Sequence, residues 1–172
     1  MPIELENRQR KYPVSLERLS FCAETVLSAL GSSKERVGVV FVNNRIIRSV
    51  NRDFRGKNAS TDVLSFQYGP SPSSDIPFPD GEILISVERA NCQAIEQGIS
   101  LESELINLLI HGICHLQGYD HELGAKEAEE MRVAERRVAQ RLKRAISNHP
   151  RHQSGPLALI DIFGKVPEVQ EK

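Results

Sequence analysis

The chain has 172 residues, and its 22 basic and 23 acidic side chains leave a formal net charge of −1. This length suits one domain with one core, and 40% hydrophobic with 26% charged residues is typical of a globular protein. The near-zero net charge argues against a protein that coats nucleic acid by bulk electrostatics, so any such contact must come from a local patch. No apolar stretch approaches the roughly 18 residues of a membrane span. The N-terminus also lacks the layout of a signal peptide, so no membrane partner is expected.

The hydrophobic pattern predicts strands and helices that alternate along the chain. The expected strands cover residues 3–6, 37–42, 62–68 and 82–86. The expected helices cover residues 16–30, 45–54, 87–97, 101–117 and 125–146. Together they predict a single α/β (or α+β) domain, although the order of the strands cannot be read from the pattern.

Two segments fall outside this regular pattern. Residues 69–81 hold four of the nine prolines and are expected to form a surface loop. Residues 148–172 are interrupted by helix breakers, and we expect a flexible C-terminal tail after a folded domain over residues 1–147. The three cysteines, Cys22, Cys92 and Cys114, are far apart and form no C-x-x-C pair, which favours a reducing, cytoplasmic location without disulfides.

Three of the five histidines fall within eleven residues, in the pattern H-x-x-x-H-x-x-G-x-x-H. His111 and His115 lie on the expected 101–117 helix, about 40° apart on one face and about 6 Å apart along its axis. Gly118 lets the chain leave the helix, so His121 can return toward the same ion. Three imidazoles with an open fourth position are typical of a catalytic zinc ion that also binds water. Three unrelated histidines are the alternative explanation.

The histidine spacing also matches the metzincin protease motif, which gives a second hypothesis. In that motif a glutamate follows the first histidine and serves as the general base. Here Gly112 occupies that position, so a metalloprotease would lack its main proton acceptor. The spacing therefore supports a metal site more strongly than it supports a protease.

A row of arginines precedes the second chemically suggestive segment. Arg45, Arg48 and Arg52 are spaced to share one helix face with Arg55, and Lys57 extends the row. The opposite face carries the apolar residues Ile46, Ile47, Val50 and Phe54. A solvated amphipathic helix explains this pattern, but a track for an RNA backbone explains it too, because Arg suits bidentate phosphate contacts.

The segment after this row contains two polar residues with two possible roles. Thr61 and Asp62 precede an expected strand, where they can act as turn and cap residues. Asp62 can instead accept a hydrogen bond from a histidine ring or serve as a catalytic base. Arg55 sits where the helix gives way to this loop, a position that suits a side chain reaching into a site.

Three motifs in this order resemble those of the bacterial YbeY family of rRNA maturation factors. The segment His111–His121 resembles the family signature H-G-x-x-H-L-x-G-Y-D-H. Residues Asn51–Phe66 resemble its N-x-x-[YF]-R…T-D-V-L-S-F hallmark, and Gly81–Ser86 is similar to its G-[DE]-I-x-I-S strand. The resemblance covers about residues 1–146.

This resemblance implies a fold, an activity and roles for particular residues. It implies a small mixed sheet of about four strands with a central buried helix that carries the histidines. It implies a zinc-dependent, single-strand-specific endoribonuclease that acts in 16S rRNA 3′-end maturation and ribosome quality control. The partners would then be single-stranded rRNA and the small ribosomal subunit or its proteins, and not DNA. The resemblance assigns His111, His115 and His121 as metal ligands and Arg55 as the principal catalytic residue that is not a ligand.

The sequence leaves open the roles of several further residues and whether the protein is catalytic. His111 and Asp62 join Arg55 as catalytic candidates, and Arg45, Arg48, Arg52 and Lys57 are RNA-binding candidates. A metal-stabilised ribosome assembly factor without catalytic activity is the alternative to the nuclease.

Overall fold

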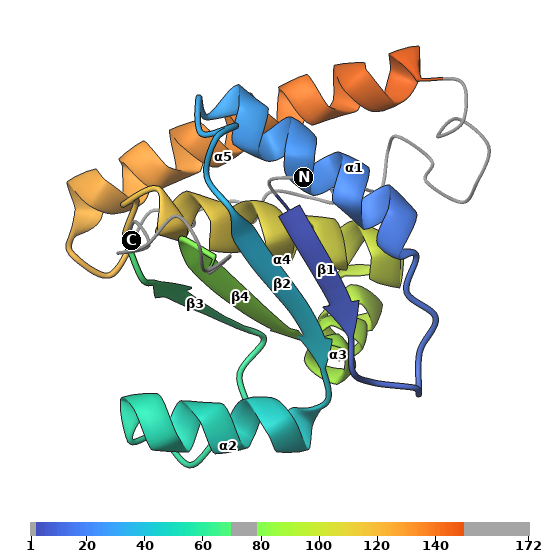
Figure 1. Ribbon diagram of the computed structural model, residues 1–172, viewed down its shortest axis with the longest axis vertical. Helices are drawn as coiled ribbons and strands as arrows, with labels where there is room; N and C mark the ends of the chain where they lie inside the picture. The colour runs from blue at the N-terminus through green and yellow to red at the C-terminus, as the bar shows by residue number, and fades with distance from the viewer. Residues whose placement is uncertain (1–2, 70–78, 150–172) are drawn as a thin grey trace, which may run out of the picture.

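Four strands form one sheet in the order β1-β2-β4-β3 in the computed structural model, which describes residues 3–69 and 79–149 (Figure 1). The strands are β1 (Ile3–Asn7), β2 (Val37–Val42), β3 (Val63–Gln67) and β4 (Gly81–Ser86). β1, β2 and β4 run parallel, whereas β3 pairs antiparallel with β4 and forms one edge of the sheet. This arrangement confirms the predicted mixed α/β sheet of about four strands.

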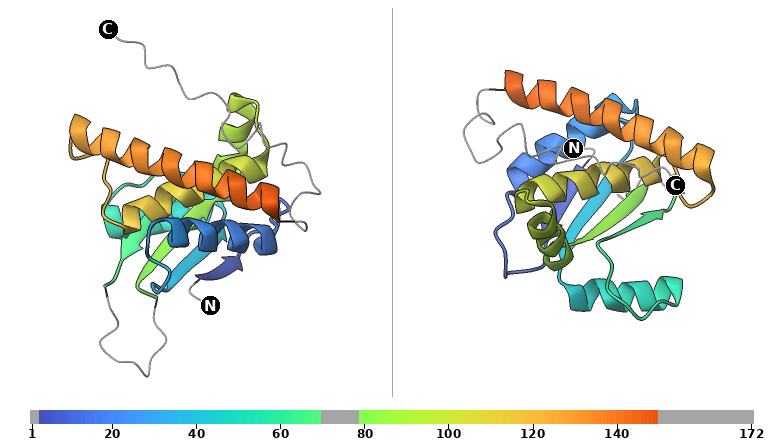
Figure 2. Two further views of the ribbon diagram at one scale, coloured as in Figure 1. Left: turned by 90° about the horizontal axis from the view of Figure 1, so that it is seen from above. Right: turned by 180° about the vertical axis from the view of Figure 1, so that it is seen from behind.

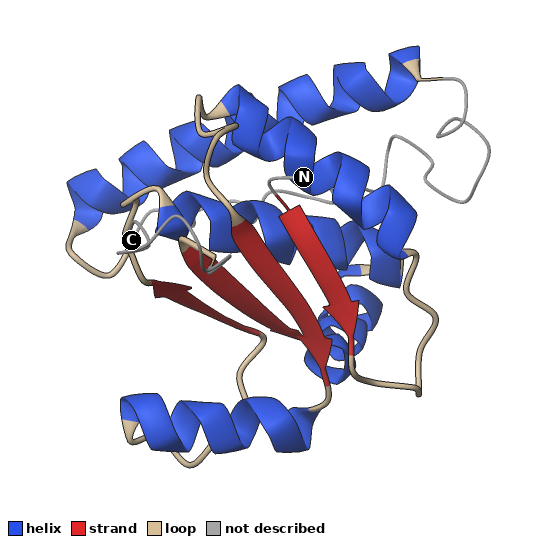
Figure 3. Cartoon of the chain, in the orientation of Figure 1, coloured by secondary structure: helices blue, strands red, loops and turns tan. Residues whose placement is uncertain are grey.

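Four of the five helices are distributed unequally over the two faces of the sheet (Figures 1 and 3). The helices are α1 (Leu16–Ala29), α2 (Asn44–Arg55), α3 (Val87–Gln97), α4 (Leu101–Leu116) and α5 (Ala125–Asn148). α1 and α4 pack on one face of the sheet, and α5 lies over both of them as an outer layer (Figure 2). α2 packs alone on the opposite face, and the fifth helix, α3, follows β4 at the end of the sheet and packs on α4. The molecule is therefore layered, with α4 sandwiched between the sheet and α5.

The alternation of side chains along the central strands builds a separate apolar core on each face. Ile83 and Ile85 of β4 point into the main core beneath α1 and α4, whereas Leu84 points into the smaller core beneath α2. Because both faces of β2 and β4 are covered, apolar residues follow one another without polar alternation over Val39–Val42 and Ile83–Ile85. α4 is buried over most of its length, as the sequence predicts for the central helix.

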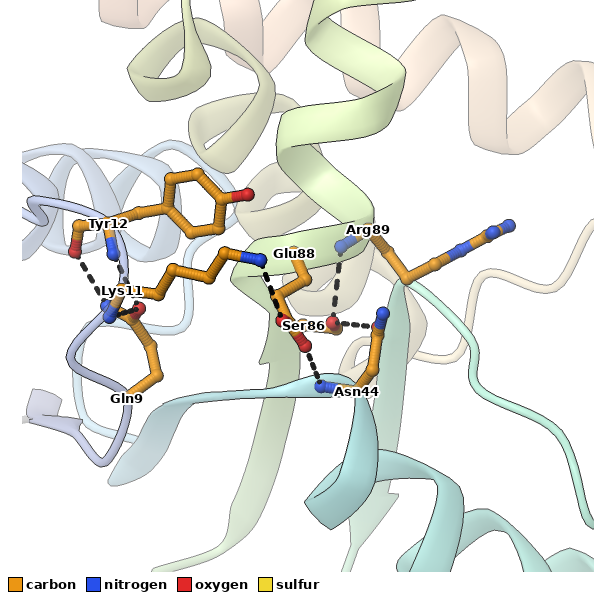
Figure 4. A network of polar contacts seen from close by, with 7 residues as sticks. All are labelled: Gln9, Lys11, Tyr12, Asn44, Ser86, Glu88 and Arg89. Atoms are coloured by element: carbon orange, nitrogen blue, oxygen red, sulfur yellow. Dashed lines mark hydrogen bonds and ion pairs between the residues drawn. The ribbon is translucent and has the colours of Figure 1, made fainter.

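The polar network in Figure 4 fixes the start of α2 to the rest of the domain. The backbone N–H of Asn44 donates to the Glu88 carboxylate at 2.7 Å, and the Ser86 hydroxyl donates to the Asn44 side-chain oxygen at 2.8 Å. Lys11 also approaches Glu88, at 3.5 Å. These contacts anchor the start of α2, while Ile47 and Val50 pack its apolar face onto the sheet.

Most predicted element boundaries agree with the structure to within one or two residues. The last helix extends to Asn148, two residues beyond its predicted end. The expected 69–81 loop lies mainly, and the expected C-terminal tail almost wholly, outside the described residues. No helix in the described ranges is long and apolar enough to cross a membrane.

Candidate metal centre

The last turns of α4 and the loop that follows bring three histidines together. His111 and His115 project from the same face of α4, and their rings lie 4.7 Å apart between centroids. Gly118 adopts a left-handed conformation, with φ of 86°, and reverses the chain. His121 in the following loop then lies 5.2 Å from the His111 ring and 5.1 Å from the His115 ring. The three side chains share one small volume, as the spacing predicts.

The distances within this cluster fit a metal ion of the zinc class. One nitrogen from each of the three rings lies within 4.8 Å of the other two. The Nε2 atoms of His111 and His115 are 3.2 Å apart. Two ligands of a tetrahedral zinc ion, with bonds of about 2.05 Å, would stand about 3.3 Å apart. This donor set therefore fits such an ion.

Glu135 on α5 orients the first of these rings, a contact that sequence analysis did not find. Its Oε1 atom lies 2.8 Å from Nδ1 of His111. A carboxylate accepts, so it favours the tautomer with the proton on Nδ1 and leaves the Nε2 lone pair facing His115. One of the two alternatives that the sequence left open for Asp62 was this partner role, and in the structure the Asp62 carboxylate bonds instead to Val63 and Gln93.

Burial also favours the metal-binding form of the His115 ring and disfavours the metal-binding form of the nearby Cys114 thiol. Burial, together with the adjacent His111 and His121, lowers the pKa of His115, which favours the neutral imidazole that metals bind. Burial raises the pKa of the Cys114 thiol to about 12, so its thiolate form is strongly disfavoured. Cys114 is fully buried on another side of α4 and does not belong to the cluster.

The histidines line a polar cleft of about 440 Å³ that Arg55 also reaches. Arg55 is the last residue of α2, on the other side of the sheet from α4, and Gly56 ends the helix there. The buried side chain of Asn51 donates to the carbonyl of Ala59 at 2.8 Å and so holds the loop that follows. This loop carries the chain around to the edge strand β3, so the cleft gathers residues from α2, β3, α4 and the loop after α4.

Asp62 also borders the cleft, but its carboxylate is engaged in other contacts. Oδ1 accepts from the Val63 backbone at 2.8 Å, and Oδ2 accepts from Gln93 at 2.9 Å. The Asp62 carbonyl accepts from the Ser86 backbone. These contacts tie the start of β3 to β4 and α3, which favours the positioning alternative over the role of a base.

The arginine row is exposed as expected, but one residue of the helix, Phe54, departs from its prediction. Arg45, Arg48, Arg52 and Arg55 are all exposed, and Lys57 is exposed in the loop after them. Within the row, Arg52 pairs with the neighbouring Asp53 at 2.9 Å. Phe54 was expected on the apolar face of the helix, but it is 73% exposed.

Gly112 allows α4 to approach the sheet closely beside the histidines. A Cβ atom at this position would lie 2.8 Å from Cγ2 of Ile83 and 3.3 Å from the Ser65 hydroxyl. The glutamate of a metalloprotease would begin with the same Cβ atom and would point into the sheet rather than into the cleft. The packing thus excludes the protease base for a steric reason that the sequence alone does not give.

A family model and curated relatives with known names place this chain beside one protein family. A family model described as Endoribonuclease YbeY matches residues 4–143. Endoribonuclease YbeY of Geobacter sulfurreducens is 41% identical over 140 residues, which cover 80% of this chain and 93% of the relative. The same-named protein of Aquifex aeolicus is 38% identical over 137 residues, which cover 80% of this chain and 90% of the relative. The solution structure of TM1509 from Thermotoga maritima matches with a TM-score of 0.58 and 27% identity, covering 90% of this chain and 97% of that one.

Adding one methyl group at Gly112 should destabilise the fold. We expect Gly112→Ala to lower the free energy of unfolding, because overpacking costs about 1–3 kcal/mol and exceeds the roughly 1 kcal/mol gained in helix preference. Gly38→Ala is the control, since its Cβ would meet only the Glu82 side chain, at an ordinary 3.6 Å from Cγ and 3.9 Å from Oε1. Urea unfolding measures both variants, and a Gly112→Ala protein as stable as the unmodified chain would contradict this packing.

Removing the Glu135 carboxylate should weaken metal binding without removing a ligand. We expect Glu135→Gln to lower zinc affinity about 10- to 100-fold, because the His111 ring loses its charged partner. Competition with a chromogenic chelator measures the affinity. Glu130→Gln, an exposed change on the same helix, is the control and should leave the affinity unchanged. Equal affinities for the two variants would show that the Glu135 contact does not support the site.

Proposed function

This chain belongs to the YbeY family of endoribonucleases, and from that premise we propose that its three-histidine cleft is the catalytic centre that cuts single-stranded RNA internally. The observation that carries the proposal is the convergence of three imidazoles and one guanidinium on a single polar cleft. Arg55 and the histidines reach it from opposite sides of the sheet. A shared reaction explains why side chains from opposite sides of the sheet meet in one cleft, and separate structural roles do not.

We assign one Zn²⁺ ion to the cluster, with His111, His115 and His121 as its ligands and a water molecule in the open position. The donor set supports zinc, because imidazole nitrogens suit this ion and neither a carboxylate nor a thiolate belongs to the group. Bound there, zinc would supply Lewis acidity toward a phosphoryl oxygen and lower the pKa of its water.

The protein's own side chains bind and orient the RNA phosphate beside this ion. Arg55 lines the cleft and carries a fixed positive charge with a planar set of donors. It would pair with the scissile phosphate and stabilise the negative charge that builds up as the bond breaks. His111 is held in one tautomer by Glu135, and Asp62 keeps the loop between Arg55 and β3 in place.

The biological substrate that we propose is the 3′ end of 16S rRNA, within or near the small ribosomal subunit. The family supports this assignment, and the local character of the basic surface agrees with it. Arg45, Arg48, Arg52 and Lys57 would contact the RNA backbone along α2, while the net charge of −1 limits binding to RNA at large. This role would place the protein in the cytoplasm, with residues 1–147 as the nuclease domain and 148–172 as its tail.

Two substitutions separate metal binding from catalysis. We expect His115→Ala to lose bound zinc and RNA cleavage together. We expect Arg55→Ala to keep the zinc and to lose at least about 100-fold in cleavage rate, the scale of removing one transition-state donor. Metal analysis and gel mapping of cut ends on single-stranded and structured RNA check both results.

Two different results of this experiment would contradict two different parts of the proposal. Full cleavage by Arg55→Ala would remove Arg55 from the catalytic residues. Absence of cutting by the metal-loaded unmodified protein, with ribosome binding retained, would favour the assembly-factor alternative.

The arginine row should determine how binding depends on salt. We expect the double change Arg45→Ala/Arg48→Ala to reduce the slope of log affinity against log salt by about 1.4, since each phosphate contact to a single strand contributes about 0.7. Arg141→Ala/Arg144→Ala removes the same charge from exposed positions six and nine residues beyond Glu135 on α5 and serves as the control. The same slope in both double variants would contradict a backbone track along α2.

A further inference from the structure

One exposed aromatic ring has no structural explanation in this fold. Phe54 on α2 is 73% exposed, and among the described Phe and Tyr residues only Tyr68 is also exposed. The smaller core beneath α2 is filled without Phe54, because the side chains of Ile47 and Leu64 already pack there and are only 0% and 1% exposed. An apolar ring left in water adds little to stability, so its position points to a role in binding.

The surroundings of Phe54 place it at the border of the cleft. It precedes Arg55 in the chain, and its ring meets the half-buried ring of Phe66 edge-on, at 5.4 Å and 60°. Phe66 lies on the edge strand β3 between Ser65 and Gln67, and both of these line the cleft. Each of the two aromatic residues is therefore next in sequence to a residue of the cleft.

The two faces of β3 separate the aromatic pair from the metal site. Ser65 points toward α4 and contacts the Gly112 carbonyl, whereas Phe66 packs on the α2 side. β3 is an edge strand, and no strand of the described residues 3–69 and 79–149 lies beyond it. A strand of RNA whose phosphate lies at Arg55 can therefore place a neighbouring base over this edge and against the Phe54 ring.

We propose that Phe54, supported from behind by Phe66, is a stacking platform for a nucleobase next to the scissile phosphate. Nucleobases of single-stranded RNA stack on exposed aromatic rings, whereas the bases of a duplex are already stacked on one another. The platform thus gives a physical reason for preferring single strands, and it tolerates all four bases. It rests on the proposed function, because it needs Arg55 to hold the adjacent phosphate.

The test separates the effect of an apolar side chain from the effect of an aromatic ring at position 54. Phe54→Leu keeps an apolar side chain but has no ring face, and Phe54→Trp keeps a ring face. Ile95→Ala on α3 is the matched control, because Ile95 is also 73% exposed and lies outside the cleft. Zinc-loaded full-length proteins are assayed for KM and kcat on a single-stranded RNA, with thermal unfolding as a check on folding.

We expect Phe54→Leu to raise KM about 5-fold or more, the lower end of the loss when one base–aromatic stack is removed. Phe54→Trp should keep KM close to that of the unmodified protein, and Ile95→Ala should not change KM. The chain contains no tryptophan, so the fluorescence of Phe54→Trp comes from this one position and should be quenched when RNA binds.

A second comparison tests whether the ring contacts a base. Substrates with one abasic nucleotide, moved along the strand, should show a position at which the unmodified protein loses affinity and Phe54→Leu loses no more. An unchanged KM in Phe54→Leu, with normal cleavage by the unmodified protein, would overturn the platform and leave the proposed nuclease intact. Failure of the unmodified, zinc-loaded protein to cut RNA would instead overturn the proposed function.

Discussion

The close approach of α4 to β4 is the constraint on which the cleft depends. Gly112 and Gly81 leave no room for a Cβ atom between the helix and the strand, where Ile83 and Leu116 fill the space. This contact fixes both the depth and the rotation of α4. His111 and His115 then emerge on the side of α4 that faces the cleft, and α5 covers the outer side and supplies Glu135. A side chain at position 112 would displace the ligands and the core together.

The edge strand β3 joins two surfaces that differ in chemistry. On its α4 side are the histidines, with a donor set suited to a metal ion. On its α2 side are the exposed arginines and Phe54, which suit a phosphate backbone and a base. Arg55 belongs to both, since it ends α2 and lines the cleft. The net charge of −1 therefore describes the whole chain and not the surface that meets RNA.

The sequence predicts what depends on local spacing. The separation of His111 and His115 fixes their shared helix face, and the helix and strand boundaries follow from periodic apolar residues. Contacts between distant segments could not be predicted in this way. Glu135 lies 24 residues from His111, and its role depends on how α5 crosses α4. Phe54 fits the apolar face by periodicity, but it is exposed at the C-terminal end of α2. The engagement of Asp62 with Gln93 likewise depends on how α3, which packs on α4 and at the end of β4, lies near the loop before β3.

Titration of zinc into chelator-treated protein tests most directly whether the three-histidine cleft is the catalytic centre. Bound zinc is counted at each step, and internal cleavage of a single-stranded RNA is measured on the same samples. We predict that cleavage is absent at the start, rises in proportion to bound zinc, and reaches its plateau at one ion per chain. Full cleavage by the chelated protein, with no bound metal, would contradict this assignment.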